Sequence, residues 1–221
     1  MIIDREKFVI DNFSGEIEIK VDKLELTIKN NVIVKEWIKE SRNLDLTINI
    51  EDNGILEYNR FGVIEDNNTK IVINQNNNSK LSFKEALIID SDISLNIKNN
   101  VLGNNNISEV IVRLTSRNES KVIVDATLDV DKDTIGNELK EDLRGLEIDN
   151  SKITIIPNML VSSSEIIANH NVTISNVNEE ELFYLNSKGI SDSDAIKLLR
   201  NGFMLSIFSN EEFKDNIKKY L

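Results

Sequence analysis

The stretch "EVIVRLTSRNESKVIVDATLDV" (Glu109–Val130) contains two runs in which apolar and polar residues alternate, joined by a short polar segment. Alternation with a period of two over four to eight residues is typical of a β-strand that buries one face. Ser, Asn and Glu between two such runs are typical of a turn. The stretch therefore predicts two strands joined by a polar turn, although consecutive apolar residues blur the alternation in places.

Similar alternation recurs from residue 15 to about residue 175. The clearest further runs are Glu16–Val21, Leu24–Ile28, Leu44–Ile50, Lys70–Asn74, Ile93–Ile97, Ser151–Ile156 and Asn171–Ser175. The segments between them are short and rich in Asn, which tolerates the left-handed backbone conformation of tight turns. An AT-rich genome would also enrich Asn, Lys and Ile, and this explanation stays open beside the first. Helix-like segments are scarce: Val32–Ser41 is one candidate, and Gly136–Gly145 is a weaker helix or a bent strand.

Many short strands at fairly regular intervals are typical of a sandwich, a barrel or a β-solenoid. The inward positions are almost uniformly Ile, Val and Leu, as expected where similar rungs stack on a continuous core. The recurrent Asn-rich corners agree with this. These features favour a mainly β solenoid over a sandwich, and the absence of a fixed repeat length predicts irregular coils.

After Ser175 the apolar spacing changes to that of helices. Polar residues able to cap a helix, with acidic residues in the following turn, occur at Asn178–Glu181, Ser191–Asp194 and Ser209–Glu212. We predict helices at Glu179–Lys188, at Asp192–Gly202 extending towards Phe208, and at Asn210–Leu221, with Gly189 ending the first. The predicted domains are a β-solenoid core at residues 1–175 and a helical region at residues 176–221.

The composition excludes several classes of protein. A net charge of -12 argues against nucleic acid and against an anionic membrane surface as partners. No apolar run approaches the roughly 18 residues that span a bilayer, and the N-terminus lacks the apolar core of a signal peptide. The chain has no Cys, which removes disulfides and the usual ligands of iron–sulfur clusters. We expect a soluble, acidic, cytoplasmic protein.

The segment "PNMLVSSSEIIANHNVTISNVNEEELFYLNSKGISDSDAIKLLRNGF" (Pro157–Phe203) has Pro, His, acidic, aromatic and Gly positions in a specific order. In this it resembles the C-terminal signature of the SufB/SufD family of iron–sulfur cluster assembly proteins. "LRGLEID" (Leu143–Asp149) is similar to the strand that precedes the signature. The resemblance covers about Leu143–Met204 and is faint before that.

The resemblance implies a right-handed parallel β-helix and a role as a scaffold on which iron–sulfur clusters are assembled, rather than as an enzyme. It implies that two SufB/SufD-like subunits pair through the end of the β-helix, and that the C-terminal helices bind SufC, an ABC-type ATPase. The chain is about half the usual family length and lacks the N-terminal helical region. We therefore expect a minimal member that forms a homodimer and holds an iron–sulfur cluster transiently.

The same resemblance assigns the metal and cluster site to His170, the only histidine, with Glu165 as a second candidate ligand. A neutral imidazole can bind iron; alternatively, His170 would only cap the last strand by hydrogen bonding. The chain departs from the family pattern, because Asn171 replaces an acidic residue and Ala168 a cysteine. The segment Asp142–Leu146 also lacks the cysteine found there in SufB-type members.

The helices supply the predicted partner contacts. We expect Phe183 and Tyr184 to pack the helices on the end of the solenoid, and the remaining apolar residues to bind the ATPase. These are Ile196, Leu199, Phe203, Met204 and Phe208. No phosphate-binding loop is present, so ATP hydrolysis is expected in the partner. Two alternatives remain: a structural interaction module without cluster chemistry, and a carbohydrate-binding β-solenoid.

Overall fold

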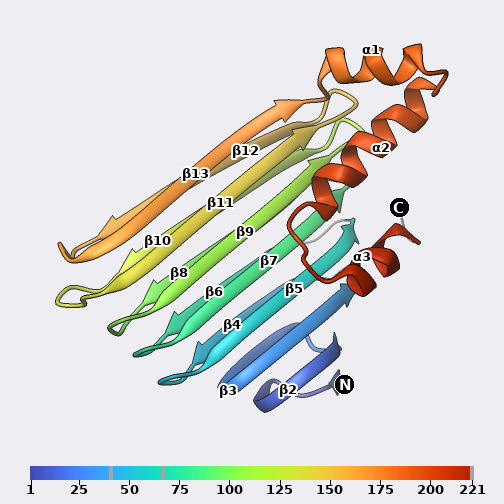
Figure 1. The fold of residues 1–221 in the computed structure, drawn as a ribbon. Helices are drawn as coiled ribbons and strands as arrows, with labels where there is room; N and C mark the ends of the chain where they lie inside the picture. Colours follow the sequence, from blue (N-terminus) through green and yellow to red (C-terminus); the bar gives the residue numbers. More distant parts are fainter. Residues whose placement is uncertain (40–41, 66–67, 220–221) are drawn as a thin grey trace.

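The computed structural model describes residues 1–39, 42–65 and 68–219. These residues form 13 strands followed by three helices (Figure 1). The strands are β1 (Ile2–Ile3), β2 (Lys7–Ile19), β3 (Lys23–Ile38), β4 (Leu44–Ile50), β5 (Ile55–Ile64), β6 (Thr69–Gln75), β7 (Lys80–Ile89), β8 (Ile93–Val101), β9 (Ile107–Ser116), β10 (Lys121–Val130), β11 (Asn137–Glu147), β12 (Lys152–Val161) and β13 (Ile166–Asn176). The helices are α1 (Glu179–Ser187), α2 (Asp192–Leu205) and α3 (Glu211–Lys218).

The strands pair in parallel and alternate between two sheets. We call these the even sheet (β4, β6, β8, β10, β12) and the odd sheet (β5, β7, β9, β11, β13). Strand β3 belongs to both, because its first half pairs with β4 and its second half with β5. The chain therefore climbs by one rung for each pair of strands (Figure 1). The predicted parallel β-helix with a C-terminal helical region is confirmed.

The rungs lengthen along the chain. The stacked residues Asn49 and Asn74 are 25 positions apart, whereas Asn104 and Ile135, stacked further along, are 31 apart. The strands of the later rungs are also longer, since β4 has 7 residues and β10 has 10. This variation explains why the sequence shows no fixed repeat length.

Asparagine residues stack at one corner of the solenoid. Asn53, Asn78 and Asn105 have φ values of 63°, 56° and 57°, so each adopts the left-handed conformation that Asn tolerates. Beside them, the backbone N–H of Asn77 donates to the side chain of Asp52 over 2.9 Å, and the N–H of Asn104 donates to that of Asn77 over 3.0 Å. Each corner thus satisfies a backbone donor of the next rung.

The interior is filled by the inward-facing residue of each alternating pair. Along β10, Val122, Val124, Ala126, Leu128 and Val130 are all buried. The intervening residues face outward and are exposed or half-buried. The period of two therefore corresponds to one face that packs on the core and one that meets solvent.

One column of charge interrupts this apolar interior. Glu36, Arg60 and Glu85 occupy the same position on β3, β5 and β7, and all three are buried. The Arg60 guanidinium donates to Glu36 over 2.6 Å and also to Glu85. The pKa of Arg60 is raised by its two carboxylate neighbours, despite a burial that opposes the charge. A slip of the rungs would leave this cation unpaired in the core, so the column helps to fix the register.

Both candidate helices in the β region are strands. Within the candidate Val32–Ser41, residues Val32–Ile38 belong to β3, with Val32 and Val34 in the core; Glu40 and Ser41 lie outside the described residues. Gly136–Gly145 falls largely in β11. Pairing with neighbouring rungs overrides the helix propensity of residues such as Glu, Lys and Leu in both segments.

The helices begin and end close to the predicted positions. Asn178, Ser191 and Asn210 cap α1, α2 and α3 by accepting hydrogen bonds from backbone N–H groups of the first turn. Helix α1 ends in a turn in which Gly189 has a φ of 85°, and the N–H of Ile190 donates to the Leu185 carbonyl. This is a Schellman motif, in which a left-handed residue such as Gly follows the helix.

Helices α2 and α3 cover part of the outer face of the odd sheet (Figure 1). The buried residues of this contact come from strands β5, β7 and β9, from the end of α2 with the segment that follows it, and from α3: Phe61, Ala86, Ile88, Ile111, Met204, Ile207, Phe208, Phe213 and Ile217. We call them the helix-anchoring cluster. Because the covered strands β7 and β9 are buried on both faces there, their apolar residues run consecutively and blur the alternation.

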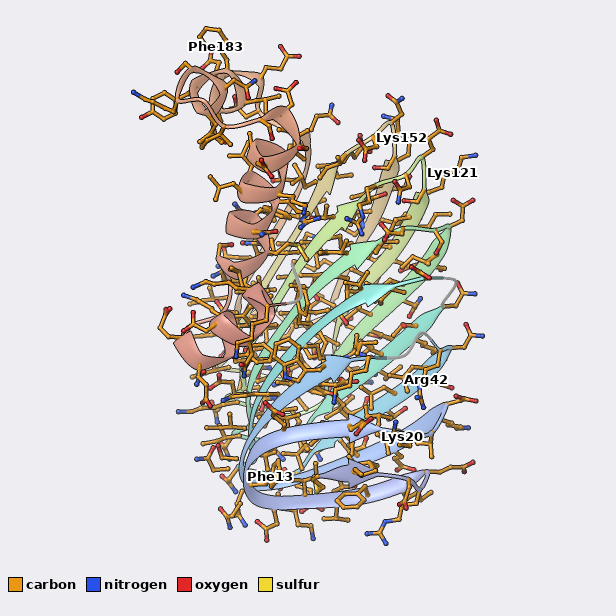
Figure 2. The ribbon with its side chains drawn as sticks, turned by 90° about the vertical axis from the view of Figure 1, so that its right-hand side faces the viewer. Phe13, Lys20, Arg42, Lys121, Lys152 and Phe183 are labelled. Carbon is orange, nitrogen blue, oxygen red and sulfur yellow. The ribbon has the colours of Figure 1, made fainter. Side chains whose placement is uncertain are left out.

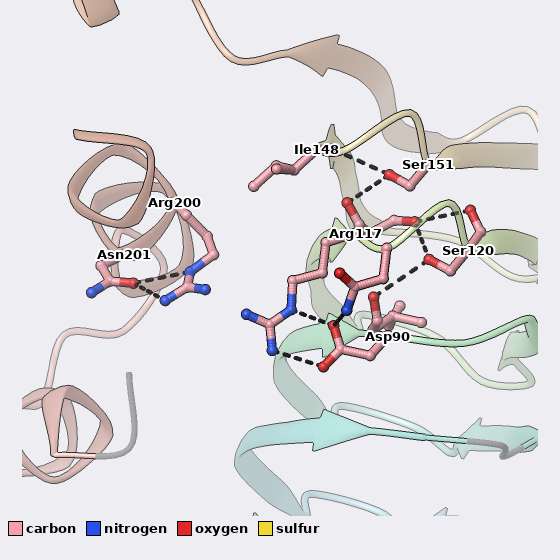
Figure 3. A network of polar contacts seen from close by, with 10 residues as sticks. Asp90, Arg117, Ser120, Ile148, Ser151, Arg200 and Asn201 are labelled. Carbon is pink, nitrogen blue, oxygen red and sulfur yellow. Dashed lines mark hydrogen bonds and ion pairs between the residues drawn. The ribbon is translucent and has the colours of Figure 1, made fainter. Parts of the chain in front are cut away.

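A polar network lies at the strand ends opposite α2 (Figure 3). Arg117 donates through Nη2 to Asp90 over 2.7 Å, and its Nε also contacts that carboxylate. Ser151 donates to the carbonyl of Ser116 over 2.6 Å, which joins two rungs. On the facing surface of α2, the Arg200 guanidinium donates to the side chain of Asn201.

No helix in the described part of the chain is long and apolar enough to cross a membrane.

Candidate functional site

The last rung, β12 and β13, leaves the solenoid open. Each of these strands is the outermost of its sheet in the described chain. Among the residues that the structure describes, no further rung covers their inward-facing side chains: Met159 and Val161 are 38% and 39% exposed, and Ile174 is 41% exposed. We call these two strands and their inward face the open end.

His170 faces inward from β13 and lies beside Glu141 of β11, its register partner. The imidazole Nδ1 is 2.9 Å from the Glu141 Oε2, and the side chains are only 14% and 2% exposed. The two atoms are in contact at ion-pair distance, and the His170 Nε2 has no hydrogen-bond partner in the described residues. A buried carboxylate and a half-buried imidazole therefore face each other at the open end.

Burial sets the charge state of this pair. Burial raises the pKa of Glu141 to about 7, since the carboxylate loses its hydration inside the solenoid. Burial also lowers the pKa of His170. Near neutral pH the imidazole is then neutral, which is the form that binds metal ions.

Glu165 lies away from His170. It precedes β13, and its carbonyl accepts a hydrogen bond from Gly136 at the corner of the rung. Five residues of extended chain separate it from His170, which corresponds to about 16 Å along a strand. The structure thus does not bring the two predicted ligands together, and Glu141 is the carboxylate that lies beside His170.

The neighbour of Glu141 connects this region to α2. Asp142 faces outward and accepts hydrogen bonds from Arg113 over 3.0 Å and from Arg144 over 2.8 Å. Although burial opposes the charge, these arginines hold the pKa of Asp142 below its ordinary value. The Arg113 guanidinium also lies 5.9 Å from the ring centre of Phe203 on α2. Asp142 of β11 is therefore linked to α2 through Arg113 of β9.

The predicted packing of Phe183 and Tyr184 on the solenoid is not observed. Helix α1 has no buried residue and packs mainly on α2. Phe183 is 76% and Tyr184 60% exposed, and Figure 2 shows Phe183 at the far end of the molecule, pointing away from the strands. The two aromatic residues face solvent because α1 projects beyond the last rung instead of lying across it (Figure 1).

The five predicted partner contacts are divided between two environments. Met204 and Phe208 are buried in the helix-anchoring cluster, and Phe203 packs against it. Met204 and Phe208 are thus covered by the contact that holds the helices on the sheet, whereas Phe203 is half-buried and keeps part of its surface exposed. Ile196 and Leu199 lie in the other half of α2 and are half-buried.

A groove between α1 and α2 lies at the projecting end. It is lined by Glu180, Glu181, Tyr184, Leu185, Leu198 and Leu199. Leu198, at 54% exposed, adds to the apolar surface of Phe183 and Tyr184. We call α1 and the first part of α2 (residues 179–199) the helical tip.

The donor set at the open end fits an iron ion better than an iron–sulfur cluster. Carboxylate oxygen and imidazole nitrogen are ligands of iron and other divalent transition metals, whereas clusters are held by thiolates, which this sequence lacks. No group of three or more His, Cys, Asp or Glu in the described part of the chain could hold a metal ion. One chain thus offers two ligands at the open end.

Glu141 is the residue that the sequence reading missed. It lies between Leu139 and Leu143, two buried residues that share its inward face. A carboxylate at an inward position of a strand is the signal that would have found it. The signal is weak in the sequence, because Gly136–Gly145 fits a helix as well as a bent strand and so has no clearly inward positions.

The fold and the open end define a parallel β-solenoid whose last rung carries a half-buried histidine and whose helices extend past it. Residues 43–203 match the family described as "SUF system FeS cluster assembly, SufBD core domain". The chain belongs to this family, and the resemblance noted in the sequence is confirmed.

Two relatives show how much is shared. The chain is 31% identical over 101 residues to an iron-sulfur cluster assembly SufBD family protein of Staphylococcus aureus (strain USA300). These 101 residues are 45% of this chain and 22% of the relative. It is 25% identical over 130 residues to an iron-sulfur cluster assembly SufBD family protein of Methanothermobacter thermautotrophicus. These 130 residues are 58% of this chain and 31% of that relative. The matched region spans less than a third of either relative.

Proposed function

We propose that this chain is a cytoplasmic scaffold subunit for iron–sulfur cluster assembly, without catalytic activity of its own. In this proposal it pairs with a second copy through the open end and is moved by a SufC-like ABC-type ATPase bound at the helical tip. The observation that carries the proposal is the last rung, which in the described part of the chain combines unpaired strand edges, exposed inward apolar residues and the half-buried His170.

Pairing through the open end is supported by the surface it exposes. Unpaired strand edges are templates for further strand pairing. The inward side chains Met159 and Val161 have the same phase as the buried core residues of β10, so a second solenoid end would complete their burial. A symmetric pair would place two copies of His170 near a shared axis.

Binding of an ATPase at the helical tip is supported by the exposure of Phe183, Tyr184 and Leu198. Large aromatic and aliphatic residues gathered on a projecting element are typical of a protein interface. The acidic residues Glu180 and Glu181 border the groove and would favour a partner surface with basic residues beside an apolar ridge.

The dimer is tested by placing a charge in the open end. We expect Met159→Glu to give a monomer in analytical ultracentrifugation where the wild type is a dimer, because the carboxylate would be buried between two copies. Thr154→Glu on the same strand, exposed and facing outward, is the matched control and should remain dimeric. A wild-type protein that is monomeric at all concentrations would refute the pairing.

The ATPase contact is tested by co-purification with the ABC-type ATPase of the same organism. The double variant Phe183→Ser/Tyr184→Ser should lose the partner while keeping the far-ultraviolet circular dichroism spectrum of the wild type. Lys197→Ser, an exposed change on α2, is the control. Retention of the ATPase by the double variant would contradict binding at the helical tip.

The absence of Cys favours a second candidate, a structural subunit that keeps the fold and the partners but takes no part in cluster chemistry. Anaerobic reconstitution with iron and sulfide separates the two candidates. Cluster absorbance that depends on His170, tested with His170→Ala, supports the scaffold. Identical spectra and iron contents for both proteins support the structural subunit.

A further inference from the structure

We propose that a second copy of this chain binds along the outer face of the odd sheet, at the ends of the strands that lie away from the helices. The surface is a stack of outward-facing side chains, Ile55, Lys80, Ile107, Glu138 and Ile167, which we call the corner column. The contact is distinct from the open end and from the helical tip, and it depends on neither.

The corner column crosses five strands in register. Ile55 pairs with Lys80, Lys80 with Ile107, Ile107 with Glu138, and Glu138 with Ile167. Neighbouring strands are about 4.8 Å apart, so the column is about 19 Å long. All five side chains are exposed, and a groove of about 500 Å³ follows the column along the sheet. The surface is therefore a straight ridge with a groove beside it.

The three isoleucines set this column apart from the outer face of the even sheet. Ile55, Ile107 and Ile167 are 39%, 46% and 61% exposed. On the even sheet, the column that begins at Asp45 continues through Lys70, Asn96 and Asp125, and these four residues are all polar. Large apolar side chains gathered on a surface are typical of a contact site.

The order of the charges selects a second copy as the occupant. Ile107 is central, with Lys80 on the strand before it, Glu138 on the strand after it, and an isoleucine at each end of the column. Reversing the column exchanges the lysine with the glutamate and leaves every isoleucine in place. A copy related by a twofold axis through Ile107, in the plane of the contact and along the strands, therefore sets Lys80 against its Glu138 and isoleucine against isoleucine.

Folding leaves both charges of the column without an ion-pair partner in the part of the chain that the structure describes. Lys80 and Glu138 are two strands apart, about 10 Å, which is too far for them to pair with each other. In the next column, by contrast, Lys140 donates to Glu109 over 2.8 Å. A second copy would thus supply partners for Lys80 and Glu138, and Glu109, which would meet its own copy at the axis, is already neutralised.

The helices leave the corner column accessible. They pack on later parts of the strands, around Phe61 and Ala86, whereas Ile55, Lys80 and Ile107 are the first residues of β5, β7 and β9 (Figure 1). Two copies would therefore meet along a corner of the solenoid. Such a contact is smaller than the roughly 800 Å² that each partner buries in a stable complex. We expect an association that reverses on dilution.

The test is sedimentation equilibrium of the open-end variant Met159→Glu at rising protein concentration, in about 0.15 M salt. At this ionic strength the repulsion between the acidic chains is screened beyond about 8 Å. We expect a dimer that forms as the concentration rises. Lys80→Glu and Glu138→Lys, each added to Met159→Glu, should weaken it about tenfold or more, because each change places two pairs of like charges in the contact.

Mixing the two charge variants identifies the partner surface. Combined in equal amounts, the Lys80→Glu and Glu138→Lys proteins should associate as the Met159→Glu parent does, because each supplies the charge that the other lacks. A protein with both changes reverses the column and should associate in the same way. Lys70→Glu, an exposed change on the even sheet, is the control and should leave the association unchanged.

The outcomes separate the corner contact from the pairing through the open end. A Met159→Glu protein that stays monomeric at every concentration would overturn the corner contact. Single charge variants that associate as tightly as their parent, or a mixture that associates no better than each variant alone, would also overturn it. A wild type that associates only as Met159→Glu does would refute the pairing through the open end and leave the corner contact standing.

Discussion

Strands β10 and β12 are neighbours in the even sheet, yet residues in the same position on the two strands have different surroundings. Leu128 on β10 is fully buried, and its register partner Met159 on β12 is 38% exposed. Val130 and Val161 differ in the same way, at 1% and 39%. The side chains of each pair point inward on both strands. In the described part of the chain, β10 has a neighbouring strand on each side, whereas β12 has one on one side.

This difference shows that burial in a solenoid is a property of the stack. An inward-facing apolar residue is buried only when another rung lies on each side of it. The open end is thus a core surface without a cover, and it marks where a second molecule would add stability. The following predictions test or refine this comparison.

The largest effect is expected from Leu128→Ala. It removes a side chain enclosed on all sides and should lower the free energy of unfolding by about 3 kcal/mol. Met159→Ala at the same level of the open end should cost about 1 kcal/mol or less in the monomer, since less apolar area is lost. Urea denaturation of both variants measures the difference, and equal losses would contradict the comparison.

The buried carboxylate near the open end should make stability depend on pH. The pKa of Glu141 is raised to about 7, so the native state binds its proton more tightly than the unfolded chain does. The contribution of Glu141 is fully favourable below a pH of about 4.5 and is lost as the pH rises through 7, by about 3 kcal/mol. In metal-free buffer, Glu141→Gln should remove this loss.

The control for this prediction is Glu138→Gln, an exposed carboxylate on the same strand. The lowered pKa of His170 acts in the opposite direction, because its contribution is present above a pH of about 6.5 and is lost as the pH falls. Thermal denaturation between pH 5 and pH 9 measures both. A wild type whose stability profile matches that of Glu141→Gln would show that the carboxylate is not buried as described.

A smaller effect is expected at the helical tip. Asn178→Ala removes the side chain that accepts hydrogen bonds from the N–H groups of Glu180 and Glu181. The local cost is about 1 kcal/mol. Because α1 has no buried residues, this loss should appear as faster hydrogen exchange in α1 and leave the unfolding of the solenoid unchanged. If Asn178→Ala instead lowers the free energy of unfolding of the solenoid and leaves hydrogen exchange in α1 unchanged, α1 is not an independent element and this prediction is wrong.

The smallest effect on stability is expected from Phe183→Ser. The ring is 76% exposed, so its removal should change the free energy of unfolding by less than about 0.5 kcal/mol. Phe213→Ser, in the helix-anchoring cluster and 1% exposed, is the contrasting variant and should cost about 3 kcal/mol, as Leu128→Ala does. A large loss for Phe183→Ser would mean that α1 packs on the solenoid after all.

Much of the fold followed from local patterns. Alternating runs such as Lys121–Val130 gave strands, and capping residues such as Asn178 and Ser191 gave the starts of helices. These features depend on neighbours in sequence, so they can be read without the structure. The segment Gly136–Gly145 was harder, because its Glu and Lys residues suit a helix and only pairing with β9 and β13 makes it a strand.

The site was less predictable for a related reason. His170 was found from the order of residues around it, but its partner Glu141 lies 29 positions earlier in the chain, as the register of β11 and β13 shows. Phe183 and Met204 were assigned the wrong surroundings, since helical spacing shows that a residue is apolar on one face and cannot show which surface that face meets.

The sequence by itself determined the strand period, the Asn-rich corners, the helix caps and the family, because each depends on residue types at short separations or in a fixed order. The tertiary structure alone decided which inward residues are covered, which helical residues reach the sheet, and which carboxylate lies beside the imidazole. Those outcomes depend on the stacking of rungs 25 to 31 residues apart. At such separations one position can meet many others, and only the register of the folded chain selects among them.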